Sequence, residues 1–151
     1  MTTRVNTLAH MDKLKPLIAY AMAARQGIEP TVARLVEIRA SQINGCAVCL
    51  VMHTQEARQA GESEERIYLL DAFRESELYD DRERAALEWT EALTRLEHGG
   101  ASYETYANLK AHFSEDEQVK LTLLIGAINA FNRLNVGFRV SPHVLKDAKA
   151  A

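Results

Sequence analysis

Both cysteines of the chain lie in one short segment, Ser41-Gln-Ile-Asn-Gly-Cys46-Ala-Val-Cys49-Leu-Val-Met-His53. The two cysteines are three residues apart, and the histidine follows the second by four. If the segment from Cys46 onward is helical, at about 100° per residue all three side chains share one narrow face. Two thiols and a base on one face suit reversible dithiol redox chemistry.

Such chemistry depends on a thiolate, because only the thiolate is nucleophilic and an ordinary thiol with a pKa of about 8.5 is mostly protonated at neutral pH. Asn44-Gly45 predicts a turn and then a helix start, where free backbone N–H groups and the helix dipole favour negative charge. His53 offers a second means, since it can take the proton of Cys49 or pair with its thiolate. After attack on an oxidant, the partner sulfur can close a disulfide.

Three other interpretations of the cysteine pair stay open on spacing alone. Two cysteines one turn apart can simply belong to a buried stripe of a core helix. Cys46, Cys49 and His53 also supply three zinc ligands, but a structural site usually needs a fourth and the chain has no other cysteine. A permanent disulfide would close so short a loop that it would constrain the unfolded chain little.

The segment resembles the core motif of the alkylhydroperoxidase D-like branch of the carboxymuconolactone decarboxylase superfamily. The likeness joins an acidic residue on the preceding helix, Glu37, to the Ser-Gln-x-Asn-Gly lead-in, the cysteine pair and the histidine. The later run Asn129-Ala-Phe-Asn-Arg-Leu-Asn135-Val is similar to the end of that family's domain, so the resemblance covers roughly residues 14–142. It implies an all-helical fold, assembly into trimers or hexamers, and reduction of peroxides by the cysteines.

The resemblance also implies a role for each residue of the motif. Cys49 is expected to attack the peroxide, Cys46 to resolve the product as a disulfide, and His53 to act as the base. An acidic residue completes the proton relay. The helix start alone would favour Cys46 as the more acidic thiol, but a base four residues away acts directly on Cys49.

Two positions depart from the best-studied branch of that family. Arg34 stands where that branch has its relay glutamate, and Val48 stands where it has a histidine between the cysteines. Glu37 lies one helical turn after Arg34, so it is expected to replace the missing glutamate and to orient His53. An ion pair with Arg34 or a solvated position is the alternative for Glu37.

The composition fits a single domain over residues 1–151. An apolar content of 47% is enough for a sizeable core, and only 7 Gly and 3 Pro favour helices over strands. A net charge of −3 without a Lys/Arg cluster argues against nucleic acid and membrane surfaces as partners. Near the N-terminus, lysines precede a short apolar run that charged residues bound on both sides. We therefore expect this stretch to be a helix and not a signal peptide, and we expect the protein to be cytoplasmic.

About six to seven helices are expected, separated by turn and capping signals. The predicted helices cover 12–25, 30–43, 46–61, a stretch from Ser63 through Phe73, one from Asp80, a short one after Ser102, and a long one from Ser114. The last helix is apolar on nearly every side, which predicts burial against two neighbours, and another protomer could be one of them.

The sequence therefore predicts a compact all-α homo-oligomer, a trimer or hexamer, that reduces hydroperoxides through a CxxC dithiol cycle. No cofactor or metal is expected, so the electrons must come from an external thiol or dithiol. Two alternatives stay open: a decarboxylase-like enzyme of the same superfamily, and a non-catalytic redox-sensing oligomer whose disulfide changes its shape or partners.

Overall fold

Helices make up the regular structure of the residues that the computed structural model describes, 2–96 and 100–143, which confirms the all-α prediction. The elements in chain order are η1 (Thr7–His10), α1 (Met11–Arg25), α2 (Pro30–Ile43), α3 (Ala47–Gln59), α4 (Glu64–Tyr68), η2 (Leu69–Glu75), α5 (Asp81–Arg95), α6 (Tyr103–His112) and α7 (Glu115–Gly137), where η marks a 3-10 helix.

Side-chain caps fix several of the helix starts at the positions that the sequence signals indicate. Asp80 and Ser114 each accept a hydrogen bond from the backbone three residues on, and Glu83 and Glu117 return the bond to complete two capping boxes. Pro30 occupies the first turn of α2, where its missing N–H costs nothing. The predicted boundaries of the principal helices are confirmed within a few residues.

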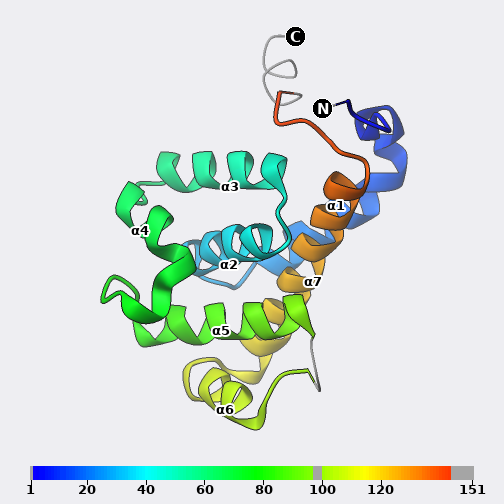
Figure 1. Cartoon of the computed structure of the whole chain (residues 1–151). Helices are drawn as coiled ribbons and strands as arrows, with labels where there is room; N and C mark the ends of the chain where they lie inside the picture. The colour runs from blue at the N-terminus through cyan, green and yellow to red at the C-terminus, as the bar shows by residue number, and fades with distance from the viewer. Residues whose placement is uncertain (1, 97–99, 144–151) are drawn as a thin grey trace.

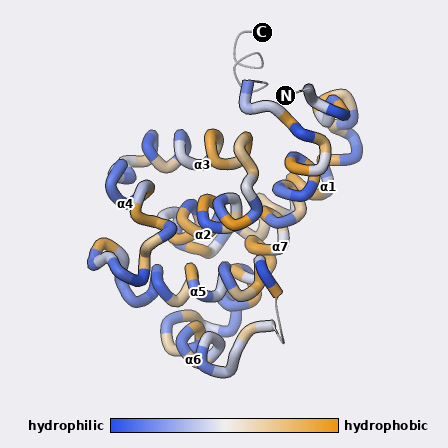
Figure 2. Tube along the Cα trace, in the orientation of Figure 1, coloured by the Kyte–Doolittle hydropathy of each residue, from blue (hydrophilic) through white to orange (hydrophobic). Residues whose placement is uncertain are grey.

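α2 is the central helix, and it packs against α3, α5 and α7 (Figure 1). α1 lies along α7, and α6 packs on α5. Hydrophobic and hydrophilic residues alternate along α2 and α7, while α3 is hydrophobic in its first half and hydrophilic in its second (Figure 2). The site segment therefore begins α3 at the end that meets the core.

The helix predicted from Ser63 through Phe73 is wrong in its second half. The α-helix stops at Tyr68, and the chain continues as the 3-10 helix η2, with a non-helical residue at Ala72 (φ −108°, ψ 26°). Tertiary contacts explain the change: Leu70 and Phe73 are fully buried, and Arg84 donates a hydrogen bond to the Phe73 carbonyl at 2.7 Å. These packing requirements override the local helix pattern.

The long helix α7 is more one-sided than its composition suggests. Leu121, Leu124 and Ile128 are buried, whereas Val119 and Val136 are 59% and 46% exposed. Among the helices that the structure describes, α7 included, none is both long enough and apolar enough to cross a membrane.

Candidate active site

The two cysteines lie at the start of α3, just after a tight turn from α2. Gly45 has a φ of +64°, a left-handed conformation that glycine adopts without a steric penalty. Cys46 is the N-cap residue of α3, and its backbone N–H donates to the Ser41 carbonyl at 3.0 Å. Cys46 and Cys49 form a disulfide with an S–S distance of 2.10 Å. The predicted turn and helix start are confirmed.

A buried polar network anchors this turn to α7. The side-chain amide of Asn44 donates to the side-chain oxygens of Asn129 and Asn132, at 2.9 Å in each case. Asn132 in turn donates to the Ser41 hydroxyl at 3.1 Å. Because each of these polar groups is paired, the network fixes the thiol segment relative to α7. The asparagines thus have a structural role here.

His53 and Glu37 meet on the inner side of α3, as the sequence predicts. Both side chains are buried, with 5% and 6% exposure, and His53 Nδ1 lies 3.5 Å from Glu37 Oε2. Glu56, one turn further along α3, brings Oε2 within 3.6 Å of the same nitrogen. Two carboxyl groups therefore face the Nδ1 edge of the imidazole ring, and neither ring nitrogen makes a hydrogen bond to a described residue.

Arg25, the last residue of α1, bridges the two carboxyl groups. Its Nη2 lies 3.2 Å from Glu37 Oε2 and 2.6 Å from Glu56 Oε1. Ligand atoms of Glu37, His53 and Glu56 lie within 4.8 Å of one another, a spacing that a metal ion could use. The Arg25 guanidinium supplies one positive charge to the two carboxyl groups.

Burial sets the protonation of this pair. It raises the pKa of Glu37 to about 7, against the opposing attraction of Arg25. Burial lowers the pKa of His53 to about 4 despite the nearby Glu56 carboxylate. At neutral pH the imidazole is therefore neutral and able to accept a proton, while Glu37 gains or loses one near that pH.

Cys49 and His53 line a cavity of about 400 Å³. Its walls come from α1, α3 and α7 and are mostly apolar, with these residues contributing: Leu14, Ile18, Ala21, Met22, Val48, Met52, Leu124, Ala127, Ile128 and Phe131. Arg25, Glu37 and Asn135 are the other polar residues nearest the thiol end. Cys46 does not line the cavity, so a molecule inside it meets the Cys49 sulfur first.

The structure therefore brings together Cys46, Cys49, His53 and Glu37, the four residues that the sequence singles out. The alternative ion pair of Glu37 with Arg34 is wrong, because the partner is Arg25 and Arg34 instead contacts the Thr31 hydroxyl at 3.4 Å. Sequence reasoning missed Arg25, whose neighbours in space are distant in the chain. It also missed Glu56, although its spacing of three from His53 was visible.

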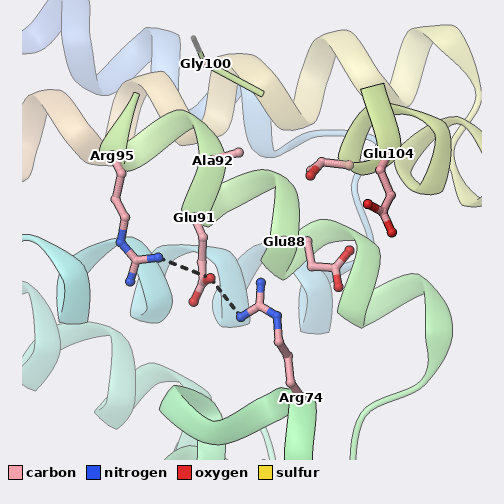
Figure 3. A pocket seen from close by; sticks show the side chains of 8 residues that line it. Arg74, Glu88, Glu91, Ala92, Arg95, Gly100 and Glu104 are labelled. Atoms are coloured by element: carbon pink, nitrogen blue, oxygen red, sulfur yellow. Dashed lines mark hydrogen bonds and ion pairs between the residues drawn. The ribbon is translucent and has the colours of Figure 1, made fainter. Parts of the chain in front are cut away.

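A second hollow, over α5 and α6, has a different character (Figure 3). There the Glu91 carboxylate accepts hydrogen bonds from Arg74 at 2.9 Å and Arg95 at 3.3 Å, and from the buried Arg39 of α2 at 2.8 Å. These hydrogen bonds to one carboxylate tie α2 and η2 to α5. We assign this cluster a structural role.

Comparison with known proteins places the chain in a family. Residues 10–92 match the model of the carboxymuconolactone decarboxylase family. The uncharacterised protein YdfG of Bacillus subtilis is 41% identical over 112 residues, which cover 74% of this chain and 76% of YdfG. The chain belongs to the carboxymuconolactone decarboxylase family.

Solved structures agree with this assignment. A protein of unknown function from Agrobacterium tumefaciens, a candidate antioxidant defence protein AhpD, superposes with a TM-score of 0.89 at 42% identity, covering 93% of this chain and 97% of that one. An uncharacterised peroxidase-related protein from Silicibacter shares the fold at 23% identity with a TM-score of 0.75, over 87% of this chain and 71% of that one. The fold is thus AhpD-like.

Proposed function

We propose that this protein is a thiol-dependent peroxidase that reduces organic hydroperoxides through a cycle between the Cys46/Cys49 dithiol and its disulfide. The observation that carries the proposal is the position of Cys49, whose sulfur meets an apolar cavity beside the His53–Glu37 pair. An apolar cavity of about 400 Å³ suits the organic group of a hydroperoxide far better than it suits hydrogen peroxide.

In the first step, His53 acts as the general base. The ionised Glu37 accepts the Nδ1–H of the neutral imidazole, which leaves Nε2 free to take the proton of the Cys49 thiol. The thiolate then attacks the terminal oxygen of the hydroperoxide, and the O–O bond breaks. The alkoxide leaving group takes the proton from His53, so the products are a sulfenic acid on Cys49 and an alcohol.

In the second step, Cys46 resolves the intermediate. Its thiol sulfur attacks the sulfenic sulfur of Cys49, the S–O bond breaks, and one water molecule leaves with the thiol proton. The disulfide that forms is the bond present in the structure. Two thiol groups of an external reductant, a protein or a small dithiol, then supply two electrons and two protons and restore both cysteines.

The two alternative functions make different demands on the site. A decarboxylase-like reaction would not require the dithiol to cycle, so the bonded pair and its position on the cavity favour the peroxidase. A redox sensor would use the same disulfide but would oxidise once and stop. Turnover with excess reductant therefore separates the sensor from the enzyme.

The test is hydroperoxide consumption with cumene hydroperoxide as substrate and dithiothreitol as reductant. The wild-type protein is expected to consume many equivalents, and Cys49→Ser is expected to consume none. Cys46→Ser should instead accumulate a sulfenic acid on Cys49, which dimedone labels and mass spectrometry locates. A sulfenic acid on Cys46 in the Cys49→Ser variant would reverse the assigned order, and one round of oxidation without turnover would favour the sensor.

A further inference from the structure

α7 presents one stripe of side chains to the thiol cavity, and its last member differs from the rest. Leu124, Ala127, Ile128 and Phe131 follow helical spacing along the cavity wall, and Asn135 continues the stripe one turn later. Asn135 is the single polar side chain that α7 contributes to this wall. Its side chain is half-buried against the cavity wall.

The partner of Asn135 is the Cys49 sulfur. The side-chain amide Nδ2 lies 3.3 Å from Cys49 Sγ and donates a hydrogen bond to it. The position of Asn135 is fixed by the helix end, where its carbonyl accepts from the Val140 N–H at 2.9 Å. The amide donor is therefore held against the reacting sulfur by α7 and not by the motif helix.

We propose that Asn135 is a catalytic residue whose amide N–H stabilises the Cys49 thiolate before it attacks the hydroperoxide. The catalytic role of Asn135 rests on the proposed peroxidase function, whereas its hydrogen bond to Cys49 is independent of that function. A disulfide sulfur is a weak acceptor, whereas a thiolate is a strong one. The same hydrogen bond becomes stronger when Cys49 is reduced and ionised, so it favours the reactive form of the enzyme.

The other charged and titratable groups that the structure describes around the cavity do not donate a hydrogen bond to the Cys49 sulfur. α1 contributes Arg25, α2 contributes Glu37, and α3 contributes His53 in addition to the cysteine. Arg25 is engaged with carboxylates, and the ring of His53 is neutral at neutral pH because burial lowers its pKa to about 4. Once His53 has taken the thiol proton, Asn135 adds a fixed hydrogen-bond donor to the Cys49 thiolate.

The contact also distinguishes the two cysteines. Among the side chains that the structure describes, the hydrogen bond from Asn135 is the one that reaches a cysteine sulfur, and it reaches Cys49. Cys46 is the N-cap of α3, where the helix dipole favours a thiolate. The amide thus offsets the advantage that the helix position gives to Cys46 and favours Cys49 as the attacking thiol.

The experiment measures the pKa of the Cys49 thiol without any peroxide. In a Cys46→Ser background, Cys49 is the one cysteine left in the chain. The rate of its alkylation by iodoacetamide is followed against pH. We expect Asn135→Ala to raise the pKa by about one pH unit, which means about tenfold slower alkylation near neutral pH. Asn135→Asp keeps the shape but places a carboxylate beside the thiolate, so it should raise the pKa further.

Asn108→Ala is the matched control, because Asn108 lies on α6 and bonds to Glu88 at 2.8 Å, away from the cavity. Its profile should equal that of the parent. An unchanged pKa in Asn135→Asp, with folding verified by circular dichroism, would overturn the proposal even if Asn135→Ala failed to fold. A raised pKa in a protein that never consumes hydroperoxide would instead refute the peroxidase function and leave the thiolate contact standing.

Discussion

At the scale of single residues, the carboxyl group of Glu37 controls the pH dependence of the proposed reaction. Burial raises its pKa to about 7, so the carboxylate form is present above that pH and is lost as the pH falls through it. The neutral imidazole of His53 persists down to about pH 4. Between these values His53 is neutral but lacks a carboxylate on Glu37 to accept its Nδ1–H, so it is a poorly oriented base.

We therefore predict that hydroperoxide turnover rises with pH through about 7 and that Glu37→Gln removes this rise, because an amide does not ionise. Above pH 8 the variant should be slower by roughly ten- to a hundredfold, as expected for the loss of a group that orients an active residue. The measurement is the rate of cumene hydroperoxide consumption against pH. Glu88→Gln, remote from the cavity, should keep the wild-type profile.

A Glu37→Gln variant with the full wild-type rise near pH 7 would contradict this role for the carboxyl group. The rise would then belong to the Cys49 thiol alone. In that case the iodoacetamide profile of Cys49 would rise over the same pH range as turnover.

Residue-scale prediction from the sequence succeeded where the relevant partners are near in the chain. The Cys46, Cys49 and His53 cluster depends on one helix, and Glu37 lies on the helix just before it. Arg25 and Asn135 reach the same site from α1 and α7, and no local pattern indicates that these helices meet there. Their contribution follows from tertiary packing, which one sequence does not reveal.

At the scale of secondary-structure elements, the turn between α2 and α3 decides where the thiols lie. Gly45 supplies its left-handed backbone, and open space surrounds the position of an added Cβ. We predict that Gly45→Ala lowers the free energy of unfolding by about 1–2 kcal/mol through backbone strain and not through a clash. Urea unfolding of the reduced protein measures this change without the disulfide.

Gly137→Ala is the control for that prediction. Gly137 closes α7 with an ordinary helical backbone and has equally open space around it. Its replacement should leave the free energy of unfolding unchanged or raise it by up to about 1 kcal/mol, because alanine is the better helix former. Equal effects of the two substitutions would show that the left-handed conformation of Gly45 contributes nothing.

Element starts were predictable because capping depends on a few adjacent residues, as at Asp80 and Ser114. The switch from α4 to η2 was not predictable, since it depends on Phe73 being buried and on Arg84 donating to its carbonyl. The one-sided burial of α7 likewise follows from which neighbours the fold supplies. Local sequence signals therefore predict where the helices start, whereas long-range contacts determine where they become irregular.

At the scale of the whole molecule, the cavity is assembled from segments distant in the sequence. η1 and α1 contribute part of the wall, α3 contributes Cys49 and His53, and α7 contributes a further part. The start of the chain is fastened to the end of α7, where the Arg4 backbone N–H donates to the Phe138 carbonyl at 2.8 Å (Figure 1). The trimer or hexamer and the single domain stay predictions, and native mass spectrometry would test the first.

The cavity gives a final prediction about substrate choice. Ala21 lies on the inner face of α1 and lines the cavity, whereas Ala19, two residues earlier, is exposed on the outer face. Ala21→Leu should narrow the space for an organic group and lower kcat/KM for cumene hydroperoxide by about tenfold, the scale of a few misfitting methylene groups. Its kcat/KM for hydrogen peroxide should change little, because that substrate needs no apolar space.

Ala19→Leu adds the same side chain to α1 without touching the cavity, so both rate constants should equal those of the wild type. A parallel fall for the two peroxides in Ala21→Leu would indicate damage to the thiol site, which the iodoacetamide profile of Cys49 would reveal. Unchanged rates with both peroxides would show that the organic group binds elsewhere. A lower kcat/KM for cumene hydroperoxide alone would show that α1 forms a wall of the substrate site.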